Sequence, residues 1–413
     1  MEYLFHAQFL PGFSFLDEAL ILILLGLLAV KGLHRLKIPV HFATWIPFLF
    51  LFTISLLLNL SQPVLAVNLL LSYLKPFILA VAVVNFLDKS DIRLVLKGFC
   101  AWTLLQIPFL AWQLGKIGYV TGTAADDYVG CLNSAHLVGG LAIVPGLWLL
   151  GKSLWEYKTE GSVNRGQLLS GMGFYFIPIF CEAKHVYMGV FPGMILFALF
   201  MDPRNFMKMA SRMAILIIPM SALVFYFGFQ YFQTMNYQTA FEFFQKIDAY
   251  FVTFFELPDK IPFPFIGAGP GMYGSAIALK TMPPLADHFF GEQIRTLEVG
   301  GTFMTPFSEL NGAIGELGYL GPVALLLPYV LHLALCLRAA SKIRNGLHWG
   351  AMFCAGSILT MLIPYTIIAQ SFVLHHLTFP ALFLSTMVLF YDELGPERPE
   401  SGLGSESPIE IHV

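Results

Sequence analysis

Long apolar runs separated by short loops are the feature that most restricts what this chain can fold into. Of its 23 Lys and Arg residues, 15 lie in five loops, three in each. The loops between these carry few basic residues, so positive charge falls in every second loop. This alternation is typical of a polytopic membrane protein whose basic loops face the cytoplasm. The five basic loops contain Lys31/Arg35/Lys37, Lys89/Arg93/Lys97, Lys152/Lys158/Arg165, Arg204/Lys208/Arg212 and Arg338/Lys342/Arg344.

The composition also favours a membrane location. The chain of 413 residues is 57% hydrophobic and 12% charged, with a mean hydropathy of +0.72. A soluble domain carries about 25% charged residues, roughly twice as many. The net charge of −3 gives no indication of nucleic-acid binding, so we expect membrane lipid and no nucleic acid as a partner.

Apolar runs of roughly 17–25 residues predict about eleven transmembrane helices in one all-α domain over residues 1–391. With the basic loops inside, the N-terminus faces out and the C-terminus faces the cytoplasm. Residues 392–413 are rich in Pro, Gly, Ser and Glu, which predicts a disordered cytoplasmic tail. The expected helices lie near 14–32, 42–60, 64–86, 94–114, 134–151, 167–182, 185–202, 213–230, 312–337, 349–369 and 376–391.

One extracytoplasmic segment, residues 231–311, is much longer than a minimal connector, and its aromatic content argues against disorder. Within it, apolar residues recur at i, i+3, i+4 and i+7, which predicts an amphipathic helix lying in the membrane interface. The same stripe would also suit packing on the transmembrane bundle, and the sequence leaves both interpretations open. The stripe consists of Tyr237, Ala240, Phe241, Phe244, Ile247, Phe251 and Phe254.

A glycine-rich stretch follows in this loop. Gly269-Pro-Gly271-Met-Tyr-Gly274 formally matches the dinucleotide-binding pattern, but no strand is expected before it. We interpret it as a turn into a short helix, whose backbone N–H groups face an anion such as a diphosphate. The alternative is a tight turn where backbone meets membrane.

Several ionisable residues lie close to apolar sequence, where a charged group costs about 2.5–3.5 kcal/mol on insertion scales and usually has a partner or a purpose. Lys184 is interpreted as a cation for phosphate, or as an interfacial anchor in a plain hairpin turn. Lys75 is a structural partner or a deeper part of the same pocket. The other candidates flank expected helices or lie in the long loop: Glu182, His185, Asn133, His136, His288, Arg295, Glu309 and Glu316.

Four segments together resemble the O-antigen ligase and polysaccharide polymerase superfamily of bacterial membrane glycosyltransferases, over about residues 40–390. A Gly-rich stretch ending in Asn opens a helix, here Gly130 to Asn133, and Ala183-Lys184 stands where the family has Ser-Arg. The family's loop segment with alternating glycines is matched at 267–271, and its Glu-x-Gly-x-x-Gly motif at 316–321. In order, the segments are GTAADDYVGCLNSAHLVGG, CEAKHVYMGVFPG, FIGAGPGMYGS and SELNGAIGELGYLG.

The resemblance implies a metal-independent transferase of the bacterial inner membrane, without a cofactor. It would move a glycan from an undecaprenyl-diphosphate carrier to the hydroxyl of a glycan or lipid acceptor on the extracytoplasmic face. Lys184 and Arg295 are the expected diphosphate-binding cations, because a leaving diphosphate develops charge that fixed cations stabilise. The family's His-Asn pair is replaced by Phe307-Ser308. We therefore expect Glu309 or His288 to act as the base.

A transporter or flippase for a lipid-linked glycan or another anionic substrate is the alternative. Lys75, Lys184 and Glu316 would then be substrate or ion-coupling residues at depth. Against it, the sequence shows no internal repeat of the kind common in transporters. No Cys/His spacing resembles a zinc site. Cys131 and Cys181 are expected at the outer ends of two helices, as free thiols or as a disulfide.

Overall fold

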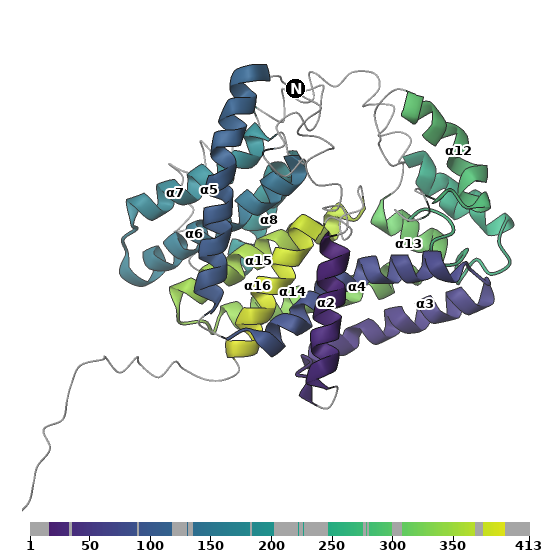
Figure 1. Cartoon of the computed structure of the whole chain (residues 1–413), viewed down its shortest axis with the longest axis horizontal. Helices are drawn as coiled ribbons and strands as arrows, with labels where there is room; N and C mark the ends of the chain where they lie inside the picture. The colour runs from purple at the N-terminus through teal and green to yellow at the C-terminus, as the bar shows by residue number, and fades with distance from the viewer. Residues whose placement is uncertain are drawn as a thin grey trace, which may run out of the picture.

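The computed structural model of the chain describes residues 16–32, 35–88, 91–117, 130, 135–181, 184–201, 222, 226, 247–275, 278, 281–299, 308–367 and 375–392. All regular structure in these residues is helical (Figure 1), which confirms the expected all-α class. The described residues omit the expected helix 213–230 apart from two positions, the first half of the aromatic stripe and the C-terminal tail.

Five helices are long and apolar enough to cross a membrane. An α-helix rises 1.5 Å per residue, so about 20 residues span the hydrocarbon core. The count of eleven spans stays a prediction, because the other apolar helices among the described residues are shorter. The five candidate spans are α4 (Pro63–Phe86), α5 (Asp91–Ile117), α6 (Ala135–Glu160), α14 (Gly321–Ala340) and α15 (Gly346–Tyr365).

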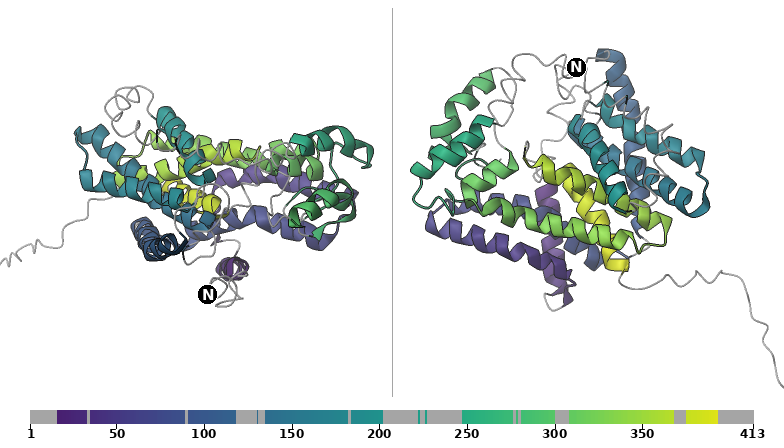
Figure 2. Two further views of the ribbon diagram at one scale, coloured as in Figure 1. Left: turned by 90° about the horizontal axis from the view of Figure 1, so that it is seen from above. Right: turned by 180° about the vertical axis from the view of Figure 1, so that it is seen from behind.

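Six further helices pack beside these five. Figure 1 shows α2 crossing α3 and α4, and the view from above in Figure 2 places α2 and α5 along one side, outside the remaining helices. α15 packs against α6, α8, α14 and α16 and is the centre of the bundle. These helices are α2 (Leu16–Lys31), η3 (Val40–Trp45), α3 (Ile46–Leu58), α7 (Arg165–Phe180), α8 (Lys184–Met201) and α16 (His375–Asp392).

Small residues allow the central helices to approach closely, as is common in membrane bundles. A Cβ on Gly193 of α8 would lie 2.5 Å from the carbonyl oxygen of Ser357 on α15. A Cβ on Gly350 of α15 would lie 2.7 Å from the carbonyl oxygen of Trp148 on α6. Any larger residue would separate these helices.

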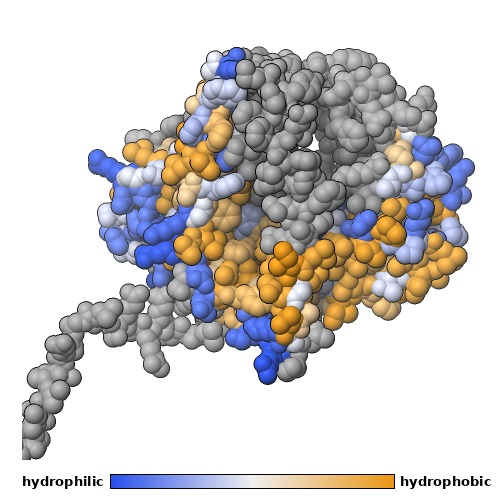
Figure 3. Space-filling view, in the orientation of Figure 1, coloured by the Kyte–Doolittle hydropathy of each residue, from blue (hydrophilic) through white to orange (hydrophobic). Residues whose placement is uncertain are grey.

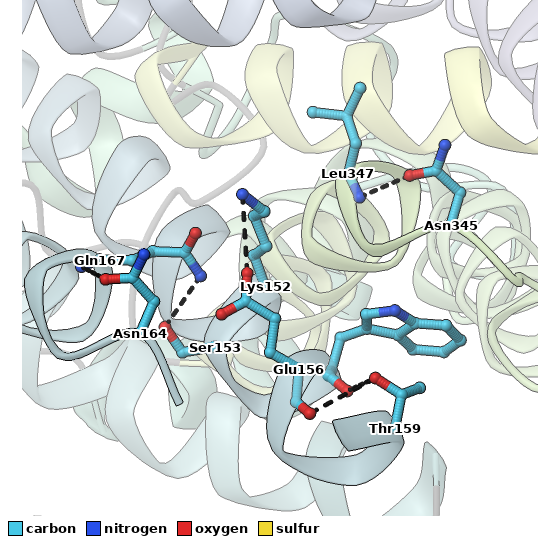
Figure 4. Close-up of polar contacts among 9 residues, drawn as sticks. Lys152, Ser153, Glu156, Thr159, Asn164, Gln167, Asn345 and Leu347 are labelled. Carbon is cyan, nitrogen blue, oxygen red and sulfur yellow. Dashed lines mark hydrogen bonds and ion pairs between the residues drawn. The ribbon is translucent and has the colours of Figure 1, made fainter. Parts of the chain in front are cut away.

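Two of the basic loops lie at the same end of the bundle. Trp155 near the end of α6 packs on Trp349 near the start of α15, with ring centroids 5.8 Å apart. Figure 4 shows the polar contacts at this end: Lys152 lies 3.7 Å from Glu156, and Asn345 accepts a hydrogen bond from the backbone N–H of Leu347 at the start of α15. The loops after α6 and before α15 therefore lie side by side.

The surface over α3 and α4 is apolar. Figure 3 shows hydrophobic residues covering these two helices, with hydrophilic residues gathered at the ends of the molecule. Such a surface is expected where helices face lipid. Its exposed members include Ile46, Phe50, Leu57, Val64 and Val67.

The expected helix over 312–337 is wrong in one respect, because it is two helices. α13 (Glu309–Leu317) ends at Gly318, and α14 begins at Gly321. Gly318 has a φ of 75°, in the left-handed region that favours glycine. A Cβ there would lie 2.0 Å from the carbonyl oxygen of Phe265. The large loop therefore presses against the junction of α13 and α14, and only glycine fits.

Candidate functional site

The first turn of α13 is fixed from two sides. Ser308 precedes the helix, and its hydroxyl accepts a hydrogen bond from the backbone N–H of Asn311 at 3.1 Å, as an N-cap residue does. The Tyr250 hydroxyl lies 2.6 Å from the Ser308 hydroxyl and donates to the carbonyl oxygen of Ile367 at 2.7 Å. One tyrosine of the large loop thus joins the start of α13 to the chain just after α15.

Glu309 is the first residue of α13, and its side chain is only 3% exposed. The hydroxyl of Tyr73, on α4, donates a hydrogen bond to Glu309 Oε1 at 2.5 Å. Tyr73 is itself buried and packs edge-on against Phe48 of α3, with ring centroids 5.6 Å apart. The bond joins residues 236 positions apart in sequence and holds the carboxyl group against the α3–α4 pair.

Glu316, in the last turn of α13, binds the glycine turn of the large loop through four backbone N–H groups. Its Oε2 accepts from Gly271 at 2.7 Å, and its Oε1 accepts from Tyr273, Gly274 and Ser275 at 3.2, 3.1 and 2.8 Å. Burial raises the pKa of this carboxyl group, and the N–H donors oppose that rise. One side chain therefore determines the path of the loop over residues 271–275.

The glycines of this turn adopt backbone conformations that other residues rarely take. Gly267, Gly269 and Gly271 have φ of 82°, 100° and 76°. A Cβ on Gly269 would lie 1.9 Å from the Ser61 hydroxyl, and one on Gly271 would lie 2.9 Å from the Leu65 Cβ. The turn therefore rests on the connection between α3 and α4, where it approaches more closely than a side chain would allow.

This geometry revises the interpretation of the glycine turn. The N–H groups of the turn bind the Glu316 carboxyl group of the same chain. The Gly269 N–H donates to the backbone carbonyl of Glu316 at 3.1 Å. The N–H groups of Gly269 and Gly271 therefore do not face a diphosphate in this structure. Glu316, expected as a supporting residue, is the internal partner that holds them.

Further polar contacts link α13 to the loop. The Thr253 hydroxyl lies 2.8 Å from the Tyr273 hydroxyl and donates to the Asn311 side-chain oxygen. Thr253 and Asn311 are fully buried, and sequence reasoning missed both. Ser308 is recognisable from the sequence as a helix N-cap, but the side-chain role of Asn311 is not. Thr253 and Tyr73 carry no local signal, because their partners lie 58 and 236 positions away.

The candidates on the long loop lie on α12 (Pro284–Val299). α12 packs on the glycine turn through Phe289 and Phe290, whose ring centroids lie 5.9 and 5.3 Å from that of Tyr273. His288 is exposed, and its ring contacts that of its neighbour Phe289. Arg295 belongs to the same helix, but its side chain lies outside the described part of the structure.

The remaining candidates divide between described and undescribed positions. Lys184 and His185 are the first two residues of α8, and His136 lies in the first turn of α6. The side chains of all three lie outside the described part of the structure. Lys75 is buried in α4 with 7% exposure. Figure 1 shows α8 and α12 on different sides of the molecule, so the structure does not bring the helices of Lys184 and Arg295 together. Glu182, Asn133 and Cys131 lie outside the described residues, and Cys181 is a buried free thiol.

Among the described residues, no group of three or more His, Cys, Asp or Glu side chains is placed to hold a metal ion. Comparisons with protein-family models, with curated proteins and with solved structures give no match to this chain.

Proposed function

We propose that the chain is a membrane glycosyltransferase of the O-antigen ligase or polymerase type, working in surface polysaccharide biosynthesis. It transfers a glycan from an undecaprenyl-diphosphate carrier to an acceptor hydroxyl, on the extracytoplasmic face of a bacterial inner membrane. The proposal combines the motif order in the sequence with the position of one carboxyl group.

The observation that carries the proposal is the buried pair of Glu309 and Tyr73. A general base is more effective when it is held in a defined orientation in a site that excludes competing water. Glu309 meets both conditions, because its carboxyl group is buried and bonded to a tyrosine that is itself packed. It also lies at the start of α13, where the large loop meets the α3–α4 pair.

In the proposed reaction, Glu309 accepts the proton of the acceptor hydroxyl. The acceptor oxygen attacks the anomeric carbon of the donor sugar, and the bond from that carbon to the diphosphate oxygen breaks. Lipid diphosphate leaves, and the candidate that stabilises its charge is either Lys184 or Arg295, because their helices lie on different sides of the molecule. Glu316 takes no chemical part, since it holds the glycine turn. His288, which is exposed on α12, is the weaker candidate for the base.

Lipid-linked glycans in the source organism provide the test. A deletion strain is complemented with wild type, Glu309→Gln, Lys184→Ala or Glu256→Gln, and the pool is profiled by mass spectrometry at matched protein abundance. Glu256 is an exposed acid of the same loop and serves as the control. Undecaprenyl-diphosphate glycan should accumulate in the deletion strain and in the strains that carry Glu309→Gln or Lys184→Ala. Transfer by Glu309→Gln should fall about 10²–10⁴-fold, and Glu256→Gln should behave as wild type.

An unchanged pool in the deletion strain would refute glycan transfer. Reconstitution of the protein in liposomes then tests the alternative function, a transporter. Movement of a lipid-linked glycan across the bilayer, without exchange of the glycosidic bond, would identify a transporter. The lipid-linked glycan can accumulate in the deletion strain yet return to the wild-type level when Glu309→Gln is supplied. In that case the transferase proposal stands, and the base is a residue other than Glu309.

A further inference from the structure

The large loop and the junction of α13 and α14 together carry a set of exposed aromatic side chains, here named the aromatic face. Phe255 and Phe265 are the most exposed, at 66% and 73%. An exposed apolar cluster of this size is unusual on a surface that faces water. The aromatic face consists of Phe251, Phe254, Phe255, Phe263, Phe265 and Tyr319.

Contacts between rings hold most of this face in a defined arrangement. Phe254 stacks on Tyr319 with centroids 6.1 Å apart, and Phe265 meets Tyr319 edge-on at 5.7 Å. Phe251 and Phe255 lie 4.8 Å apart. Rings that pack on one another yet stay exposed form a built surface rather than scattered apolar residues.

The aromatic face continues directly into a candidate span. Tyr319 is followed by Leu320 and Val323 at the start of α14, which are 63% and 64% exposed. α14 is long and apolar enough to cross a membrane. The aromatic face therefore lies where one end of this span leaves the hydrocarbon.

Polar residues follow closely in the same segment. Glu256, Asp259 and Lys260 are all exposed and lie between Phe255 and Phe263 in sequence. Figure 3 shows hydrophobic and hydrophilic residues mixed at the edge of the molecule below α12. Aromatic side chains beside charged ones are typical of a segment at a membrane boundary, where apolar rings reach the acyl region and charges stay in water.

We propose that the aromatic face lies in the interfacial region of the bilayer and contacts phospholipid. The phenylalanines of this face are then embedded in one leaflet beside α14, while Glu256, Asp259 and Lys260 stay on its water side. The occupant is the surrounding bilayer, because the face is continuous with the exposed start of a candidate span. Contact with lipid is expected whatever reaction the chain performs, so its test is independent of transferase activity.

Spin labels test this placement. Cysteine is introduced singly as Phe255→Cys, Phe265→Cys or Asp259→Cys in full-length protein without its five native cysteines. The protein is placed in phosphatidylcholine nanodiscs. Collisions of each label with oxygen, which concentrates in lipid, are compared with those of the water-soluble nickel complex NiEDDA. Labels at 255 and 265 should collide mainly with oxygen, and the label at 259 mainly with NiEDDA.

Two outcomes would overturn the proposal. Labels at 255 and 265 that meet NiEDDA as freely as the label at 259 would place the face in water. Labels at all three positions that meet neither reagent would indicate a protein partner or a second copy. Because the cysteine-free protein can fail to fold, Phe255→Trp and Asp259→Trp with all native cysteines provide a second measurement. Brominated phosphatidylcholine should quench the added fluorescence at 255 and not at 259, and equal quenching would contradict the proposal.

Discussion

Replacing Gly267 by alanine tests whether the large loop is locked onto the junction of α13 and α14. A Cβ at this position would lie 2.4 Å from the backbone carbonyl carbon of Glu316 and 2.5 Å from the backbone nitrogen of Gly318. Both neighbours are backbone atoms, so no side-chain rotation relieves the contact. The φ of 82° adds strain for any residue with a Cβ.

Two other glycines provide a graded comparison. Alanine at Gly269 has a similar backbone strain, with φ of 100°, but its closest contact is the Ser61 hydroxyl, which can rotate away. In the described part of the structure, the Ser61 hydroxyl has no hydrogen-bond partner, so its rotation breaks none. Alanine at Gly173, inside α7, meets nothing within 4 Å.

The expected costs follow from these contacts. Left-handed strain contributes about 1–2 kcal/mol and overpacking about 1–3 kcal/mol, so Gly267→Ala should lose roughly 2–5 kcal/mol of unfolding free energy. Gly269→Ala should lose about 1–2 kcal/mol, mainly from strain. Gly173→Ala should gain about 0.5–1 kcal/mol, because alanine favours a helix over glycine.

Unfolding by dodecyl sulfate in mixed micelles measures these free energies, and hydrogen exchange over residues 266–275 locates the change. Exchange of the amides bonded to Glu316 should accelerate in Gly267→Ala and stay unchanged in Gly173→Ala. A Gly267→Ala variant no less stable than Gly269→Ala would refute the close approach of loop and junction. Added Ser61→Ala should recover little stability in Gly269→Ala, because the loss there comes mainly from backbone strain.

Two further outcomes concern the glutamates of α13. Because burial raises the folded-state pKa of Glu316, its stabilising contribution is complete below the ordinary value of 4.5 and is lost as pH rises through the folded value. The unfolding free energy of wild type should thus fall as the pH rises above about 4.5, and Glu316→Gln should remove this slope; a flat wild-type profile would contradict the burial effect. Tyr73→Phe removes the donor to Glu309 and should lower kcat about tenfold, for a hydrogen bond of roughly 1.5 kcal/mol, with KM nearly unchanged. An equal loss through KM would show that Tyr73 serves substrate binding instead.

Patterns that repeat locally in the sequence predicted much of the fold. Helical class and several helix positions follow from apolar runs, and the turn at Gly269 and Gly271 follows from the glycine spacing. The break at Gly318 was missed, because the residues around it are as apolar as those of a single helix. Gly318 itself, followed by Gly321 and Pro322, is a local signal for a helix end. The close approach of the Phe265 carbonyl, 53 positions earlier, has no signature near Gly318.

The sequence predicted which acidic residues belong to the site, but not which groups they bind. Glu309 and Glu316 were recognised as candidates because they are acids at the edge of apolar sequence. Their partners are a tyrosine on α4 and the backbone of the glycine turn, neither of which reveals itself without the fold. Lys184 and Arg295 were grouped by charge and expected side, and charge alone does not determine which helices become neighbours.

The contacts around α13 connect the aromatic face to the proposed base. Tyr250 stacks with Phe254 of the aromatic face at 6.5 Å and bonds through its hydroxyl to Ser308, which caps α13. Glu309 is the next residue, and its other anchor is Tyr73 on a candidate span. Two anchors therefore position one carboxyl group, the first through the aromatic face and the second through the bundle. If the aromatic face rests in the bilayer as proposed, a displacement of that face relative to α4 would shift Ser308 against Tyr73 and move Glu309.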